Sequence, residues 1–172
     1  MKQFNSFLLI SMCFLLIAFH PIQPQDTKGK WYTYLSEEGK VRINFPAEYA
    51  EEVKANNPNA PRKISARYNN VDYILSYTIH ETPIVMHSEM AKVSVESFVE
   101  ALGGELVMNK AYTYKGNTGQ SALIMLKNGQ LTVNYRVILV GQIQYQVIVV
   151  SPTASQDIKT LNKFLKSFKL IE

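Results

Sequence analysis

Cysteine is nearly absent from this sequence, in which Cys13 is the single one among 172 residues. A lipoprotein attachment site would need a small residue before the cysteine, but Met12 stands there, and Cys13 lies inside an apolar run rather than after it. If that run is removed as a signal, the mature chain has no disulfide, no thiolate nucleophile and no cysteine-bound metal.

Concentrated charge of one sign is also lacking. The chain has 18 basic and 14 acidic residues and a net charge of +4, with no polybasic tract and no arginine-rich arm. The basic residues are spread along the chain, with a modest excess in the last predicted helix. This distribution argues against a nucleic-acid partner and leaves acidic surfaces or anionic lipids as alternatives.

Motifs of well-known catalytic sites are missing as well. The sequence contains no G-x-S-x-G, S-x-x-K or H-E-x-x-H motif. The segment 116–119 resembles a phosphate-binding loop only superficially, because the lysine and the Ser or Thr that should follow are missing. His80 and His87, with Glu81 beside the first, supply too few ligands for a metal site. We therefore predict no catalytic residue, no metal site and no cofactor.

The N-terminus has the layout of a secretory signal. Lys2 is followed by the apolar run Phe7–Phe19, then by two prolines and a polar segment. The run is shorter than the ~20 apolar residues that cross a bilayer. We predict a signal peptide over residues 1–25 and a periplasmic or extracellular protein. An uncleaved N-terminal anchor is the alternative, and only then would the protein contact a membrane.

The remaining residues, 26–172, fit a single domain with one hydrophobic core. Asn69-Asn70 and Asn128-Gly129 suit the positive φ of tight hairpin turns. Residues 47–54 have the composition of a helix. Alternating patterns between turn residues predict strands over 31–36, 41–45, 62–68, 71–80, 105–114, 119–127, 130–140 and 143–150.

Two segments show helical periodicity. Over 88–102 the apolar residues fall on one face, with Ser88 as the predicted N-cap and Gly103-Gly104 at the end. Over 155–168 lysines occupy one side of the predicted helix. Its apolar side consists of Ile158, Leu161, Phe164, Leu165 and Phe168. We predict an α+β fold in which helices flank an antiparallel sheet of six or more strands.

Alternation along the last two long strands suggests a polar face. We interpret the apolar residues of 131–139 and of 143–149 as sharing one side of the sheet. The opposite side then carries Asn134, Arg136, Gln144 and Gln146, whose amide and guanidinium groups suit a peptide, a glycan or an anionic group. We predict these four as ligand-binding residues. Alternatively, a covering segment buries them and they satisfy one another.

Two further features of the strands have two interpretations each. An ion pair of Arg136 with Asp72 or Glu105 is favoured, and an open guanidinium that recognises an anionic group is the alternative. Tyr112 and Tyr114 lie on one face of their strand. Cross-strand packing is favoured for them over an aromatic platform for a carbohydrate or peptide.

Three segments resemble the PsbP-like/Mog1-like superfamily. They are Glu37–Pro46, which ends a strand with Phe-Pro, the helix end Leu102–Gly104, and Tyr145–Val150 followed by Phe164–Phe168. The resemblance implies an α/β/α sandwich around an antiparallel sheet. Members include photosystem subunits, a GTPase-binding nuclear factor and bacterial envelope domains, which are chiefly binding and assembly proteins. None of their partner-contact motifs can be placed on this sequence, so no functional residue is transferred.

These observations predict a non-catalytic binding or assembly module of the bacterial cell envelope. Its partner would be a protein, peptide or glycan of the envelope. The alternative is a hydrolase that acts on an envelope substrate through histidine and carboxylate groups in the polar cleft. Convergence of His80, His87 and a carboxylate within hydrogen-bond reach would favour the hydrolase.

Overall fold

The computed structural model describes residues 29–53 and 60–171. The predicted signal peptide, residues 1–25, lies outside the described residues, so its presence and cleavage stay predictions. Among the described residues, no helix has both the length and the apolar character that a membrane crossing requires.

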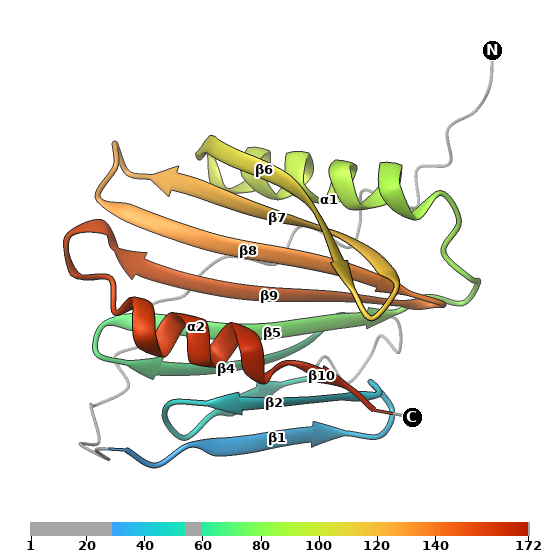
Figure 1. The fold of residues 1–172 in the computed structure, drawn as a ribbon, viewed down its shortest axis with the longest axis horizontal. Coiled ribbons are helices and arrows are strands. Elements are labelled where there is room, and N and C mark those ends of the chain that lie inside the picture. The colour runs from blue at the N-terminus through green and yellow to red at the C-terminus, as the bar shows by residue number, and fades with distance from the viewer. Residues whose placement is uncertain (1–28, 54–59, 172) are drawn as a thin grey trace.

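Seven strands form an antiparallel sheet in the order β3-β4-β5-β9-β8-β7-β6 (Figure 1). This confirms the predicted α+β fold with six or more antiparallel strands. The central strand β9 is apolar on both sides from Val147 to Val150, because both faces of the sheet are covered there. The strands are β3 (Ala50–Glu52), β4 (Arg62–Tyr68), β5 (Val71–Ile79), β6 (Glu105–Tyr114), β7 (Asn117–Leu126), β8 (Leu131–Val140) and β9 (Ile143–Pro152).

A second, smaller sheet contains three strands from the two ends of the described chain. β1 (Tyr32–Ser36) and β2 (Val41–Phe45) form a hairpin, and β10 (Lys169–Leu170) pairs with β2. Sequence reasoning did not predict this sheet, because β10 is only two residues long and its partner lies at the opposite end of the domain.

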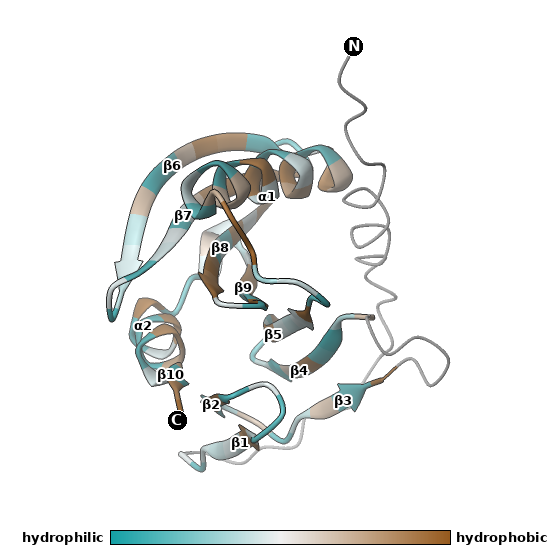
Figure 2. Cartoon of the chain, turned by 90° about the vertical axis from the view of Figure 1, so that its right-hand side faces the viewer, coloured by the Kyte–Doolittle hydropathy of each residue, from teal (hydrophilic) through white to brown (hydrophobic). Residues whose placement is uncertain are grey.

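The helices lie on opposite faces of the large sheet (Figures 1 and 2). α1 (His87–Leu102) packs on β7 and β8. A 3₁₀ turn, Thr153–Ser155, precedes α2 (Ile158–Ser167), which shares the other face with the small sheet. The Asp157 carboxylate caps α2 by accepting hydrogen bonds from the main-chain nitrogens of Lys159 at 3.0 Å and Thr160 at 3.1 Å.

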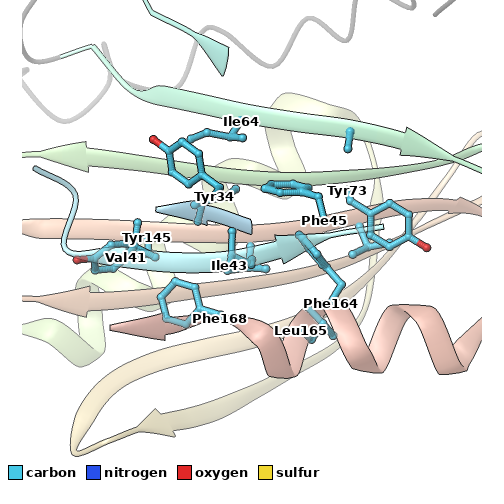
Figure 3. Close-up of a cluster of buried hydrophobic side chains, with 14 of the residues drawn as sticks. Tyr34, Val41, Ile43, Phe45, Ile64, Tyr73, Tyr145, Phe164, Leu165 and Phe168 are labelled. Carbon is cyan, nitrogen blue, oxygen red and sulfur yellow. The ribbon is translucent and has the colours of Figure 1, made fainter. Parts of the chain in front are cut away.

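The larger hydrophobic core lies between α2, the small sheet and the large sheet (Figure 3). Phe164 of α2 is 0% exposed, and its ring centroid lies 5.3 Å from that of Phe45 and 5.2 Å from that of Tyr73. One aromatic side chain thus joins the helix to both sheets.

A second core lies between α1 and the other face of the large sheet. Its centre is Phe98 of α1 stacked on Tyr135 of β8, with ring centroids 4.3 Å apart. Complete burial raises the pKa of the Tyr135 hydroxyl. The sheet therefore has a hydrophobic core on each side, rather than one core face and one polar face as predicted.

Two predictions of local structure were wrong. Residues 47–53 of the helix predicted at 47–54 do not form a helix, and residue 54 lies outside the described residues. The middle of this segment is the exposed edge strand β3, because pairing with β4 outweighs the helix preference of alanine and glutamate. The other concerns the start of α1. The N-cap is Met86, with φ 56° and no side-chain cap, so the predicted N-cap Ser88 lies within the first turn.

Candidate functional site

The four predicted ligand-binding residues do not share one face of the sheet. The register of β8 and β9 places Val137 opposite Gln146, and residues directly opposite each other point to the same side. Gln144 and Gln146 therefore lie on the α1 side with Val137. Asn134 and Arg136 lie on the α2 side. The predicted grouping of all four was wrong.

Gln144 is used within the fold. Its side-chain nitrogen lies 3.5 Å from the Ser94 hydroxyl oxygen of α1, at the limit of a hydrogen bond. Gln146 is half-buried between Ser76 of β5 and Val137 of β8. Gln144 contacts α1 and Gln146 lies on the same side of the sheet, away from Asn134 and Arg136, so the two amides are not retained in the candidate site.

Asn134 and Arg136 belong to a polar surface that we call the Arg136 face. Ser121 of β7 lies opposite Arg136, and Lys110 of β6 lies opposite Ser121. Figure 2 shows that β6 and β7 curl toward the side of α2, which makes this the inner side of the curve. The residues of the Arg136 face are Lys110, Tyr112, Ser121, Asn134 and Arg136, of which Lys110 is exposed and the others are half-buried.

The guanidinium of Arg136 stacks on an aromatic ring. Its central carbon lies 5.0 Å from the ring centroid of Tyr112, a distance at which a cation–π interaction contributes about 0.5–1 kcal/mol. The favoured ion pair is not formed, because Asp72 pairs with Arg67 instead, at 3.8 Å between Oδ1 and Nε. Within the described residues, Glu105 forms no ion pair with Arg136 either. The hydrogen-bonding edge of the guanidinium is left for another partner.

The two tyrosines of β6 have different roles. Tyr114 packs as predicted, with its ring 5.4 Å from that of Phe168 and its hydroxyl donating a 3.0 Å hydrogen bond to the Phe168 carbonyl. Tyr112 lies over Gly119, where an added Cβ would approach the Tyr112 ring to 3.3 Å and overlap the Val137 carbonyl oxygen. The missing side chain leaves room for the ring that supports Arg136.

Asn134 carries a buried donor without a partner. Its Nδ2 atom has no hydrogen-bond partner among the described residues. Across the strands its neighbours are Leu123 and Val149, which offer no side-chain acceptor. An unsatisfied buried donor costs about 1–3 kcal/mol. The atom is enclosed by the fold, so a partner accepts a hydrogen bond from it only after a local rearrangement. The sequence signal was visible: a polar residue two positions from Arg136 in an otherwise apolar strand.

The two histidines do not form a catalytic pair. The His87 ring lies 2.6 Å from the Ile84 carbonyl oxygen, while the buried Nε2 of His80 has no hydrogen-bond partner in the described part of the chain. Burial lowers the pKa of His80, and hydrogen bonding with Gln144 opposes the shift. In residues 29–53 and 60–171, no three His, Cys, Asp or Glu side chains gather as a metal site.

Sequence reasoning missed a second site, an open pocket of about 590 Å³ beside α2. We call it the basic pocket. The sequence does contain an indication of this pocket. The spacing of Lys159, Lys163 and Lys166 places three cations on one side of the helix. It is lined by Arg42, Asn44, Lys159, Asn162, Lys163, Lys166, Ser167 and Lys169.

Solved structures resemble this fold, although comparison of the sequence with known families and curated proteins gives no match. The solution structure of cyanobacterial PsbP from Synechocystis sp. PCC 6803 superposes with a TM-score of 0.61 at 11% identity, over 88% of this chain and 99% of that one.

Two further solved structures are more distant. A Bacteroides thetaiotaomicron protein gives a TM-score of 0.43 at 10% identity, over 81% of this chain and 48% of that one. A Pseudomonas aeruginosa protein of unknown function gives 0.45 at 12%, over 73% and 85%. By its similarity to the cyanobacterial structure, this chain has a PsbP-like fold.

Proposed function

We propose that this chain is a non-catalytic binding or assembly module of the bacterial cell envelope. In this proposal the Arg136 face holds a protein, peptide or glycan partner. The signal-like N-terminus supports an exported protein, and the separate surroundings of the two histidines favour binding over hydrolysis. The PsbP-like fold is compatible with such a role, but a fold does not set a function.

The observation that carries the proposal is the unsatisfied polarity of two neighbouring side chains. Arg136 is stacked on Tyr112 without an ion pair among the described residues, and the Asn134 amide has a buried donor without an acceptor. A stacked guanidinium loses little conformational freedom on binding, because its plane is already oriented. Both groups donate hydrogen bonds, so the partner presents carbonyl, carboxylate or hydroxyl oxygens.

Replacing Arg136 by alanine should abolish capture of the partner while leaving the fold intact. Among the described residues its side chain makes a cation–π contact and no ion pair, so the free energy of unfolding should fall by no more than about 1 kcal/mol. The measurement is affinity capture from the native envelope fraction, together with urea denaturation of each variant.

Lys92→Ala on the exposed side of α1 is the matched control for lost charge. Arg136→Lys keeps the charge but removes the planar fork, and it should bind weakly. Undiminished capture by Arg136→Ala would exclude the Arg136 face as the binding surface.

Replacing Asn134 by leucine should stabilise the protein and weaken binding at the same time. Leucine removes the unsatisfied donor and packs between Leu123 and Val149, so the free energy of unfolding should rise by about 1 kcal/mol. Binding should weaken because the partner loses a hydrogen bond. Chemical denaturation and capture on the same samples test this. A destabilised variant would show that the amide is satisfied in the folded protein.

A further inference from the structure

The basic pocket is formed where the outer side of α2 meets the outer side of the small sheet. The apolar side of α2 faces the core, so its lysines point away from it. On β2, Arg42 and Asn44 alternate with buried residues and lie on the outer side, and Lys169 of β10 lies opposite Arg42. Folding thus brings cations from both ends of the domain together.

These cations lack the carboxylate partners that basic residues have elsewhere in the protein. On β4, the side chains of Arg62, Lys63 and Arg67 lie 3.0, 3.1 and 3.8 Å from acidic side chains. No such pair is formed by the five cations of the pocket among the described residues, and no lining residue is acidic. Lys159 also interacts electrostatically with Asp157, but that carboxylate is hydrogen-bonded as the cap of α2.

Several contacts hold the pocket in shape. The Ser167 hydroxyl accepts a 3.0 Å hydrogen bond from the Asn44 nitrogen and donates a 2.7 Å hydrogen bond to the Phe164 carbonyl. The Lys163 ammonium lies 4.1 Å from the centroid of the Trp31 ring. Like charges that line one pocket repel one another, so an anion that enters the pocket relieves the repulsion.

We propose that the basic pocket binds a linear polymer that carries several phosphate groups and no nucleobases. Its volume and five cations exceed what one phosphate needs, and lysine ammonium groups accept tetrahedral anions from many directions. Its lining has no apolar or aromatic side chain. Burial of an apolar peptide anchor, insertion of a helix into a membrane and stacking of nucleobases all need such side chains. The site lies on other elements than the Arg136 face and does not depend on the function proposed for that face.

Trp31 provides a direct readout, because it is the only tryptophan of the chain and Lys163 lies over its ring. Long-chain inorganic polyphosphate is titrated into the full protein at low ionic strength, and Trp31 fluorescence is recorded. The pocket variant Arg42→Gln/Lys166→Gln removes two exposed cations but leaves the Lys163–Trp31 contact. The variant Lys92→Gln/Lys115→Gln removes the same charge outside the pocket.

We expect saturable binding that raises the melting temperature and weakens with added salt. The pocket variant should bind at least about tenfold more weakly, because hydrogen bonds to charged groups are lost. The control variant should stay within about twofold of the wild type. A second pocket variant, Lys159→Gln/Lys169→Gln, should show the same loss of affinity. Agreement between the two variants excludes misfolding of one of them as the cause.

Three results would overturn the proposal. The first is no saturable fluorescence change with polyphosphate at low salt. The second is equal weakening by the pocket and control variants, which would indicate general charge attraction. The third is tighter binding of polyglutamate, of vesicles rich in anionic phospholipid or of single-stranded DNA than of polyphosphate, which would assign the pocket to another class of partner.

Discussion

Replacing Phe164 by alanine should lower the free energy of unfolding by about 3–5 kcal/mol. The side chain is fully buried, and its ring contacts Phe45 of the small sheet and Tyr73 of the large sheet. Truncation therefore leaves a cavity at the junction of α2 with both sheets, which surrounding rings cannot fill without losing their own contacts. Urea denaturation monitored by circular dichroism measures the loss.

Ile158→Ala is the matched control in the same helix. Ile158 is 53% exposed, so its truncation should cost less than about 1 kcal/mol. The sequence pattern had placed it on the buried face, but it is the first residue of α2 and lies beyond the edge of the core. Equal losses for the two variants would show that α2 does not dock through Phe164.

Replacing Gly119 by alanine should cost about 1–3 kcal/mol and also weaken partner capture. The new Cβ would overlap the main-chain carbonyl oxygen of Val137, which the β7–β8 pairing holds in place. The strands would have to separate locally, and the Tyr112 ring would no longer be held against the Arg136 guanidinium.

Ser121→Ala is the control for the glycine substitution. It lies two residues along the same strand on the same face, and its substitution by alanine adds no atoms. Its stability should stay within about 0.5 kcal/mol of the wild type. If Gly119→Ala unfolds at the same denaturant concentration as the wild type, β7 and β8 do not approach each other as closely at Gly119 as the structure shows.

Much of the fold could be predicted because local patterns carry it. Asn69 and Asn70 both have positive φ in the turn that their identity suggested, and Gly103 ends α1 in the left-handed conformation. The small sheet could not be predicted, since no local pattern links Lys169 to Arg42. Local composition also misled at residues 50–52, where strand pairing at the sheet edge outweighs a preference for helix.

The error in the candidate site came from register rather than from residue type. The two-residue turn Gly141-Gln142 pairs Val140 with Ile143, so odd-numbered residues of β8 lie opposite even-numbered residues of β9. The turn was recognised from the sequence, and applying its register would have separated Asn134 from Gln146. The contact of Arg136 with Tyr112 could not be predicted in this way, because it depends on the curl of β6 and on the space left by Gly119.

The most direct test of the account is photo-crosslinking from the Arg136 face. A photoreactive amino acid replaces Lys110, which is exposed on that face, and in a second protein it replaces Val93, which is 39% exposed on α1. Both proteins are illuminated in the native envelope fraction. We predict one dominant adduct from position 110 that disappears when Arg136→Ala is added, and none of that mass from position 93. The same adduct from both positions, or its persistence without Arg136, would contradict the assignment of this face as the binding surface.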